Sequence, residues 1–160
     1  MHYTSLFLDK REYLQQSDKT ELRSASYTYN LFNRLGAKKC ALCGCEIPEI
    51  IQGAHIWGVA QISRTPGLDD DTKFNHAVSG HNGLWLCQNH HKLFDSNIIL
   101  LDNDGFVRLK GNLVTDDVAF IRSTTFRTAV DARFLSAEFK DYLAKRNETL
   151  DLEHSHRLAV

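Results

Sequence analysis

Two short motifs, each holding a pair of possible zinc ligands, constrain this chain more than any other feature. Cys40-x-x-Cys43 and Cys87-x-x-His90 have the spacing of tight zinc-binding turns. Together they form a Cys₃His set, which suits a tetrahedral structural zinc ion. A redox pair is the usual alternative for an isolated Cys-x-x-Cys, and buried free cysteines are the alternative for the whole set. A shared zinc ion would hold two distant parts of the chain together.

Length and composition are those of one ordinary globular domain. The chain has 160 residues, of which 42% are hydrophobic and 24% charged. Residues 1–11 lack the apolar core of a signal peptide, and no run approaches the ~18 apolar residues of a membrane span. We therefore expect a cytoplasmic protein, in which cysteines are better explained as metal ligands than as disulfide partners. Cys45 is interpreted as an unligated thiol, although it could replace Cys43 if the turn is shifted.

The net charge of −1 counts mildly against a nucleic-acid partner, because non-specific DNA binding depends on Lys and Arg side chains that neutralise phosphates. A local basic groove is compatible with a neutral total. Candidate phosphate contacts are Lys92, Arg64, Lys73 and Arg108, although a solvated surface charge is the simpler explanation of each.

Hydrophobic periodicity predicts an α+β fold. A helix is expected over residues 10–35, with Leu22, Ser26, Tyr29 and Phe32 on its packing face and Gly36 as its stop. Strands are expected at 50–56 and 83–86, and a short helix at 90–96. Residues 57–80 show no clear periodicity and are predicted to form a long loop.

The second half of the chain is predicted to begin with a β-hairpin. Its strands, residues 98–102 and 106–109, flank the turn sequence Asn103-Asp104-Gly105. Two helices follow, at 116–123 and 137–150, and Ser136 is the expected N-cap of the second. The polar tail from residue 151 onward is predicted to be a frayed end or a linker.

A second ligand group lies beside the first. His91 and Asp95 are four residues apart, so both side chains lie on one face of a helix. One imidazole and one carboxylate leave most coordination positions open, which suits Mg²⁺ or Mn²⁺ acting on a phosphate. The alternative is a hydrogen-bonded His–Asp pair. His55 ends the first strand and is a candidate general base, with a packed core histidine as the alternative.

In order, these motifs resemble the HNH endonucleases, whose active site has the ββα-metal fold. The resemblance covers roughly residues 38–110. It implies that His55 is the general base, that Asn82 braces the loop between the two strands, and that His91 binds the catalytic metal with Asp95 as a further ligand. The chain departs from the family at Ala54, where many members carry another metal ligand. His76 and His81 are candidate replacements from the loop.

The Ala54-His55-Ile56 sequence and the Phe94-Asp95 ending also resemble nuclease domains that are fused to cyclic-oligonucleotide sensor (SAVED) domains in bacterial anti-phage defence. No such sensor is present in these 160 residues. The resemblance implies a role in defence and a possible cyclic-nucleotide sensor partner.

We therefore predict a ββα-metal (HNH) nuclease core with a zinc knuckle, flanked by N- and C-terminal helices. The predicted divisions are a helical segment (1–36), the nuclease core (37–112), C-terminal helices (113–150) and a tail or linker (151–160). The expected activity is metal-dependent hydrolysis of DNA phosphodiester bonds, with a homodimer for double-strand cleavage. A non-catalytic zinc module that binds nucleic acid or protein is the main alternative, and a zinc hydrolase of small molecules is a third.

Overall fold

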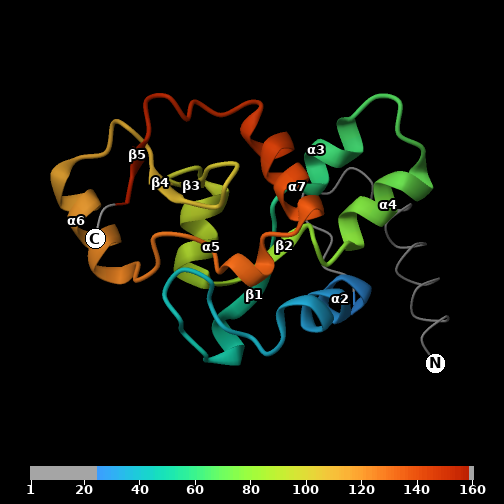
Figure 1. Ribbon diagram of the computed structural model, residues 1–160, viewed down its shortest axis with the longest axis horizontal. Helices are drawn as coiled ribbons and strands as arrows, with labels where there is room; N and C mark the ends of the chain where they lie inside the picture. Colours follow the sequence, from blue (N-terminus) through green and yellow to red (C-terminus); the bar gives the residue numbers. More distant parts are fainter. Residues whose placement is uncertain (1–24, 159–160) are drawn as a thin grey trace.

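The computed structural model describes residues 25–158, so the predicted helical residues 10–24 lie outside it. Helices and short strands are interspersed along the chain (Figure 1). Within this part of the chain, the helices are too short or too polar to cross a membrane. The elements are α2 (Ala25–Leu35), η1 (Pro48–Ile50), β1 (Ile51–His55), α3 (Val59–Arg64), α4 (Asp70–Val78), β2 (Gly83–Cys87), α5 (Gln88–Asp95), β3 (Ile99–Leu101), β4 (Val107–Leu109), α6 (Thr115–Thr124), η2 (Ala132–Phe134), α7 (Ala137–Asn147) and β5 (His156–Arg157).

The centre of the molecule is an antiparallel strand pair that leads directly into a helix. Strand β1 pairs with β2 in a register that places Ile51 opposite Cys87 and His55 opposite Gly83. Every residue of β2 is buried, and α5 begins at the next residue and packs against both strands (Figure 1). The predicted α+β fold and its two-strand, one-helix core are therefore confirmed.

Helix α2 packs closely on this strand pair because two glycines lie beneath it. A Cβ atom on Gly53 would lie 2.5 Å from Leu31 Cδ1, and a Cβ atom on Gly83 would collide with the Tyr27 hydroxyl. The helix ends as predicted at Gly36, which has a φ of 78° that favours glycine. The fold thus depends on the absence of side chains at Gly53 and Gly83.

The packing face predicted for this helix is partly wrong. Tyr29 and Phe32 are 51% and 43% exposed, whereas Tyr27 and Leu31 are almost fully buried. Both pairs occur at helical spacing, so periodicity alone cannot distinguish them. The glycines on the strands select Tyr27 and Leu31 as the residues that face the core.

The long loop predicted over residues 57–80 is also wrong, because this stretch forms helices α3 and α4. Asp69 is the N-cap of α4, because its Oδ1 accepts a hydrogen bond from the Thr72 amide at 2.7 Å. Asp70 and Asp71 then lie in the first turn, where negative charge is favourable. Phe74 is buried against the core.

Strands β3 and β4 form the predicted hairpin. Gly105 has a φ of 85°, and Asp102 Oδ1 accepts hydrogen bonds from the amides of Asp104 and Phe106 at 3.0 Å each. The prediction of a frayed tail is wrong, since β5 pairs with β4 and Leu158 is buried. Arg108 anchors this end of the chain by donating to Ser155 Oγ at 2.6 Å.

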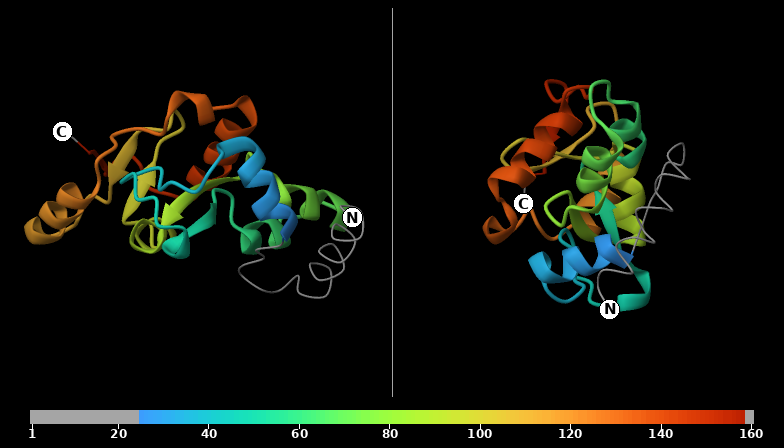
Figure 2. Two further views of the ribbon diagram at one scale, coloured as in Figure 1. Left: turned by 90° about the horizontal axis from the view of Figure 1, so that it is seen from below. Right: turned by 90° about the vertical axis from the view of Figure 1, so that its right-hand side faces the viewer.

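Both C-terminal helices are present. Ser136 caps α7 as predicted, accepting a hydrogen bond from the Phe139 amide at 3.1 Å. Helix α6 lies at one end of the molecule and α4 at the other, with the strand pair and α5 between them (Figures 1 and 2).

Candidate functional site

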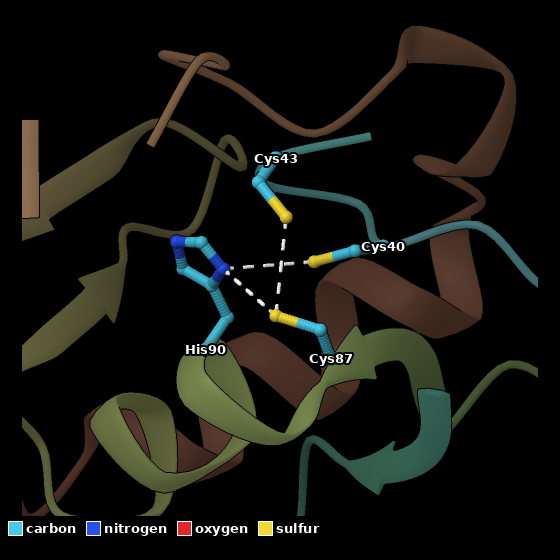
Figure 3. A group of neighbouring side chains, drawn as sticks. All are labelled: Cys40, Cys43, Cys87 and His90. Atoms are coloured by element: carbon cyan, nitrogen blue, oxygen red, sulfur yellow. Dashed lines mark hydrogen bonds between the residues drawn. The ribbon is translucent and has the colours of Figure 1, made fainter. Parts of the chain in front are cut away.

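The four predicted zinc ligands converge on one point (Figure 3). The ligand atoms of Cys40, Cys43, Cys87 and His90 all lie within 4.8 Å of one another. Cys43 Sγ is 3.8 Å from Cys87 Sγ, and His90 Nδ1 is 3.7 Å from Cys40 Sγ and 3.2 Å from Cys87 Sγ. Tetrahedral zinc with Zn–S bonds of about 2.3 Å and a Zn–N bond of about 2.0 Å requires ligand separations of roughly 3.6–3.8 Å. The donor set and its spacing therefore fit a zinc ion, and the cluster contains Cys43, not Cys45.

The protonation of these thiols is linked to any metal ion that binds there. Burial raises the pKa of the Cys43 thiol to about 12; a backbone hydrogen bond from Cys45 opposes this shift, and the thiols of Cys40 and Cys87 add to it. A coordinated thiol is deprotonated, so a zinc ion that binds here would have to displace this proton.

A segment far along the sequence supports the cluster from behind. With His90 Nδ1 facing the sulfur atoms, His90 Nε2 carries the proton and donates to Thr125 Oγ1 at 2.9 Å. The amides of Phe126 and Arg127 both donate to Leu42 O, at 2.9 and 3.1 Å, within the first turn of the cluster. Thr125 was not predicted, because a threonine after a helix has no distinctive sequence signal.

A second site lies around a cavity of about 370 Å³, which we call the His55 cavity. It brings together His55 from β1 and both His91 and Asp95 from α5, as the resemblance implied. Its lining residues are His55, Gly58, Val59, Gln61, His91, Asp95, Asn97, Arg146, Thr149 and Leu150.

His55 is buried and held in one orientation. Its Nε2 lies 2.8 Å from Ala77 O, which can only accept a hydrogen bond, so Nε2 carries the proton of the neutral ring. The lone pair is then on Nδ1. The Tyr27 ring stacks on the imidazole, with centroids 4.0 Å apart and planes 10° from parallel. This tautomer is one that can accept a proton while the Ala77 carbonyl stabilises the resulting cation.

Asn82 is fully buried and lies outside the lining of the His55 cavity. Its Oδ1 accepts from the Trp57 amide at 2.8 Å, and its Nδ2 donates to Trp57 O and His76 O at 3.0 Å each. The side chain thus ties both ends of the connection between β1 and β2 together. Any effect of Asn82 on a reaction would act through the position of His55.

His91 and Asp95 form the second ligand pair, with Nε2 of His91 3.1 Å from Asp95 Oδ2. Nδ1 of His91 lies 3.0 Å from Gln52 Oε1, so a proton on Nδ1 leaves the Nε2 lone pair facing the carboxylate. Two acceptors this close require a proton or a cation between them. Adjacent ligands of an octahedral ion with bonds of about 2.1 Å are roughly 3.0 Å apart, so the pair fits Mg²⁺ or Mn²⁺.

Arg146 of α7 is the residue of this site that sequence analysis missed. Arg146 lines the His55 cavity, and its guanidinium donates to Ile56 O at 3.1 Å, Phe94 O at 2.7 Å and Asn97 Oδ1 at 3.1 Å. Burial lowers its pKa to about 10, an effect that the nearby Asp95 opposes, so it stays charged at neutral pH. A buried cation beside an open cavity offers a place for an anion.

The other candidates from the sequence contact different parts of the structure. The ring of His76 pairs with the Tyr142 hydroxyl at 2.8 Å, and that of His81 with Ser136 Oγ at 2.7 Å. The replacement ligands suggested for Ala54 therefore do not reach the cavity. Nor do the four basic residues predicted as phosphate contacts, Lys92, Arg64, Lys73 and Arg108, line it.

The fold and the two sites define a two-strand, one-helix unit with a zinc-type cluster beside an open His/Asp site. Residues 40–102 match the family model described as HNH endonuclease. The resemblance to the HNH endonucleases is therefore confirmed over this segment, and the family suggests a nuclease. Among curated proteins, none matches the chain significantly.

Proposed function

We propose that the chain is a metal-dependent endonuclease that hydrolyses DNA phosphodiester bonds. The observation that carries the proposal is the convergence of His55, the His91–Asp95 pair and Arg146 on one cavity from three separate elements. A structural zinc module has no need for these groups around a shared open space.

In this proposal His55 acts as the general base. Its Nδ1 takes a proton from the attacking water, and the Ala77 carbonyl stabilises the imidazolium through Nε2. Arg146 binds an oxygen of the scissile phosphate and offsets its charge. Mg²⁺ or Mn²⁺ held by His91 and Asp95 would stabilise the negative charge that develops on the phosphate and the leaving oxygen.

The position of Arg146 indicates how far along the chain the nuclease unit extends. The predicted nuclease core ends at residue 112, whereas Arg146 belongs to α7 and lines the His55 cavity. We propose that the nuclease unit extends from α2 through α7, with the C-terminal helix as one wall of the site.

The test is plasmid cleavage by the purified chain in EDTA and after addition of Mg²⁺ or Mn²⁺, with zinc quantified on the same sample. The proposal predicts cleavage that EDTA abolishes and that Mg²⁺ or Mn²⁺ restores, with one zinc per chain throughout. DNA binding without cleavage would instead support the non-catalytic zinc module. Cleavage of RNA but not DNA would support phosphodiester hydrolysis at this site but show that DNA is not the substrate.

We further propose that the nuclease acts as a homodimer in defence against phage. The described residues form one His55 cavity per chain. Cleavage of both strands of a DNA duplex takes two active sites, which supports a dimer. The defence role is supported by the resemblance to SAVED-fused nuclease domains through Ala54-His55-Ile56. Sedimentation of the chain on DNA tests the dimer. Phage plating on cells that express wild type or His55→Gln tests the role in defence.

A further inference from the structure

Tyr27 of α2 is placed against the proposed general base, although it lies outside the segment that matches the HNH model. Its side chain is 1% exposed. The ring lies face to face with the His55 imidazole at 4.0 Å, and the hydroxyl donates to Asn82 O at 3.0 Å. One side chain thus contacts His55 and also the residue that closes the connection between β1 and β2.

The strand pair is built to admit this side chain. Gly83 lies opposite His55 in the register, and any side chain there would occupy the position of the Tyr27 hydroxyl. A Cβ atom on Gly53 would lie 3.0 Å from Tyr27 Cε1. Core packing alone would be satisfied by larger strand residues and a smaller helix residue, so the combination of two glycines with a tyrosine needs another explanation.

We propose that Tyr27 is a positioning residue for His55. The inference rests on the proposed function, in which Nδ1 of His55 removes a proton from water. The hydrogen bond to Ala77 O fixes one edge of the imidazole, and the Tyr27 ring fixes its plane. Together the two contacts fix the orientation of the His55 imidazole, so the Nδ1 lone pair points in one direction. Either contact alone would permit the imidazole to tilt.

The expected effect is on the chemical step rather than on DNA binding. A small displacement of a catalytic group lowers a rate by about 100-fold, because proton transfer requires close alignment. Tyr27 is absent from the cavity lining, so its replacement leaves the phosphate contact of Arg146 intact. The ring, and not the hydroxyl, carries the stacking contact.

The test compares Tyr27→Phe and Tyr27→Met with Leu31→Ala as a matched control. Leu31 is fully buried on the same helix and packs on the same two glycines, without a stacking contact to His55. Steady-state cleavage at saturating DNA in Mg²⁺ gives kcat, anisotropy of labelled DNA in EDTA gives DNA affinity, and thermal melting gives stability. We expect Tyr27→Met to lower kcat by roughly 10–100-fold with binding unchanged. Tyr27→Phe should recover most of the rate, and Leu31→Ala should lose stability with less than a threefold loss of kcat. If Tyr27→Met does not fold, Tyr27→Leu replaces it.

An NMR measurement separates failure of this inference from failure of the proposed function. Stacking moves the His55 Hε1 resonance upfield, and the His55→Gln variant assigns it. We expect the upfield shift in wild type, Tyr27→Phe and Leu31→Ala, and its loss in Tyr27→Met. Loss of the shift with an unchanged kcat in an active enzyme would overturn the positioning role alone. A wild type that shows the shift but cleaves nothing would refute the nuclease instead.

Discussion

His90 and His91 are adjacent in the sequence but face two different sites. His90 Nδ1 lies 3.2 Å from Cys87 Sγ in the zinc-type cluster, whereas His91 Nε2 lies 3.1 Å from Asp95 Oδ2 at the edge of the His55 cavity. Neighbouring side chains on a helix diverge by about 100°, so one turn of α5 can serve both sites. The zinc-type cluster and the His55 cavity are therefore fixed to each other through α5.

This arrangement predicts opposite outcomes for two neighbouring substitutions. His90→Ala removes one of four zinc ligands and should lower the free energy of unfolding by roughly 4 kcal/mol or more, with loss of bound zinc. His91→Ala should retain one zinc per chain and the wild-type melting temperature to within a few degrees, but lose cleavage. Metal analysis, thermal melting and plasmid cleavage on the same preparations provide the comparison. Loss of zinc from His91→Ala would show that the two roles are reversed.

Thr125 should contribute to zinc affinity without touching the metal. Thr125→Val keeps the shape of the side chain but removes the partner of His90 Nε2. Zinc affinity should fall about 10–100-fold, as for other partners of metal-bound histidines. Competition with a chromophoric chelator measures this change. Thr124→Val is the control, since the Thr124 hydroxyl donates only to backbone carbonyls of α6.

Arg146 is expected to govern phosphate binding. Arg146→Met should raise KM for DNA about 10–100-fold, which is the range for the loss of one charge-assisted hydrogen bond. The slope of log affinity against log salt concentration should also decrease, by an amount that corresponds to about one phosphate contact. The measurement is KM and DNA affinity over a series of salt concentrations.

Asn147→Ala is the matched control for this substitution. Asn147 is the next residue of α7 and donates to Leu101 O at 2.9 Å, outside the His55 cavity. It should reduce stability while leaving KM and the salt dependence unchanged. If both variants behave alike, Arg146 only holds α7 in place.

The stability of the fold should fall in mildly acidic solution because of His76. Burial, and then the charge of Lys145, lower the pKa of His76 from its ordinary value of 6.5. Below pH 6.5 the unfolded chain therefore binds a proton that the folded protein does not, and stability falls as the pH drops until the folded-state pKa is reached. Urea unfolding between pH 7 and 5 should show a shallower loss for His76→Gln than for wild type. His156→Gln, an exposed histidine on β5, should follow the wild type.

The sequence was most informative where ligand chemistry imposes a spacing. Cys40-x-x-Cys43 and Cys87-x-x-His90 could be paired because few other functions require those residues together, and His91 and Asp95 because they occupy one helical face. The turn at Gly105 and the cap at Ser136 were equally predictable, since each follows from local backbone geometry.

The residues that complete the sites carry no such local signal. Tyr27 and Arg146 are ordinary helix residues until the tertiary fold places one on the His55 ring and the other in the His55 cavity. Asp69 gives no clear signal of the helix that it caps, because the same residue types serve as helix caps and as loop residues. Pairing of β5 with β4 joins segments that are far apart in the sequence, so no local sequence pattern predicts it.

The central claim is that His55 removes a proton from water at a metal-dependent nuclease site. The most direct measurement is the single-turnover rate of plasmid cleavage in Mg²⁺ by wild type, His55→Gln and the control His156→Gln. We predict that His55→Gln loses about 10²–10⁴-fold in rate while it keeps its zinc and its affinity for DNA, and that His156→Gln retains the wild-type rate. Cleavage by His55→Gln within a fewfold of wild type would contradict it.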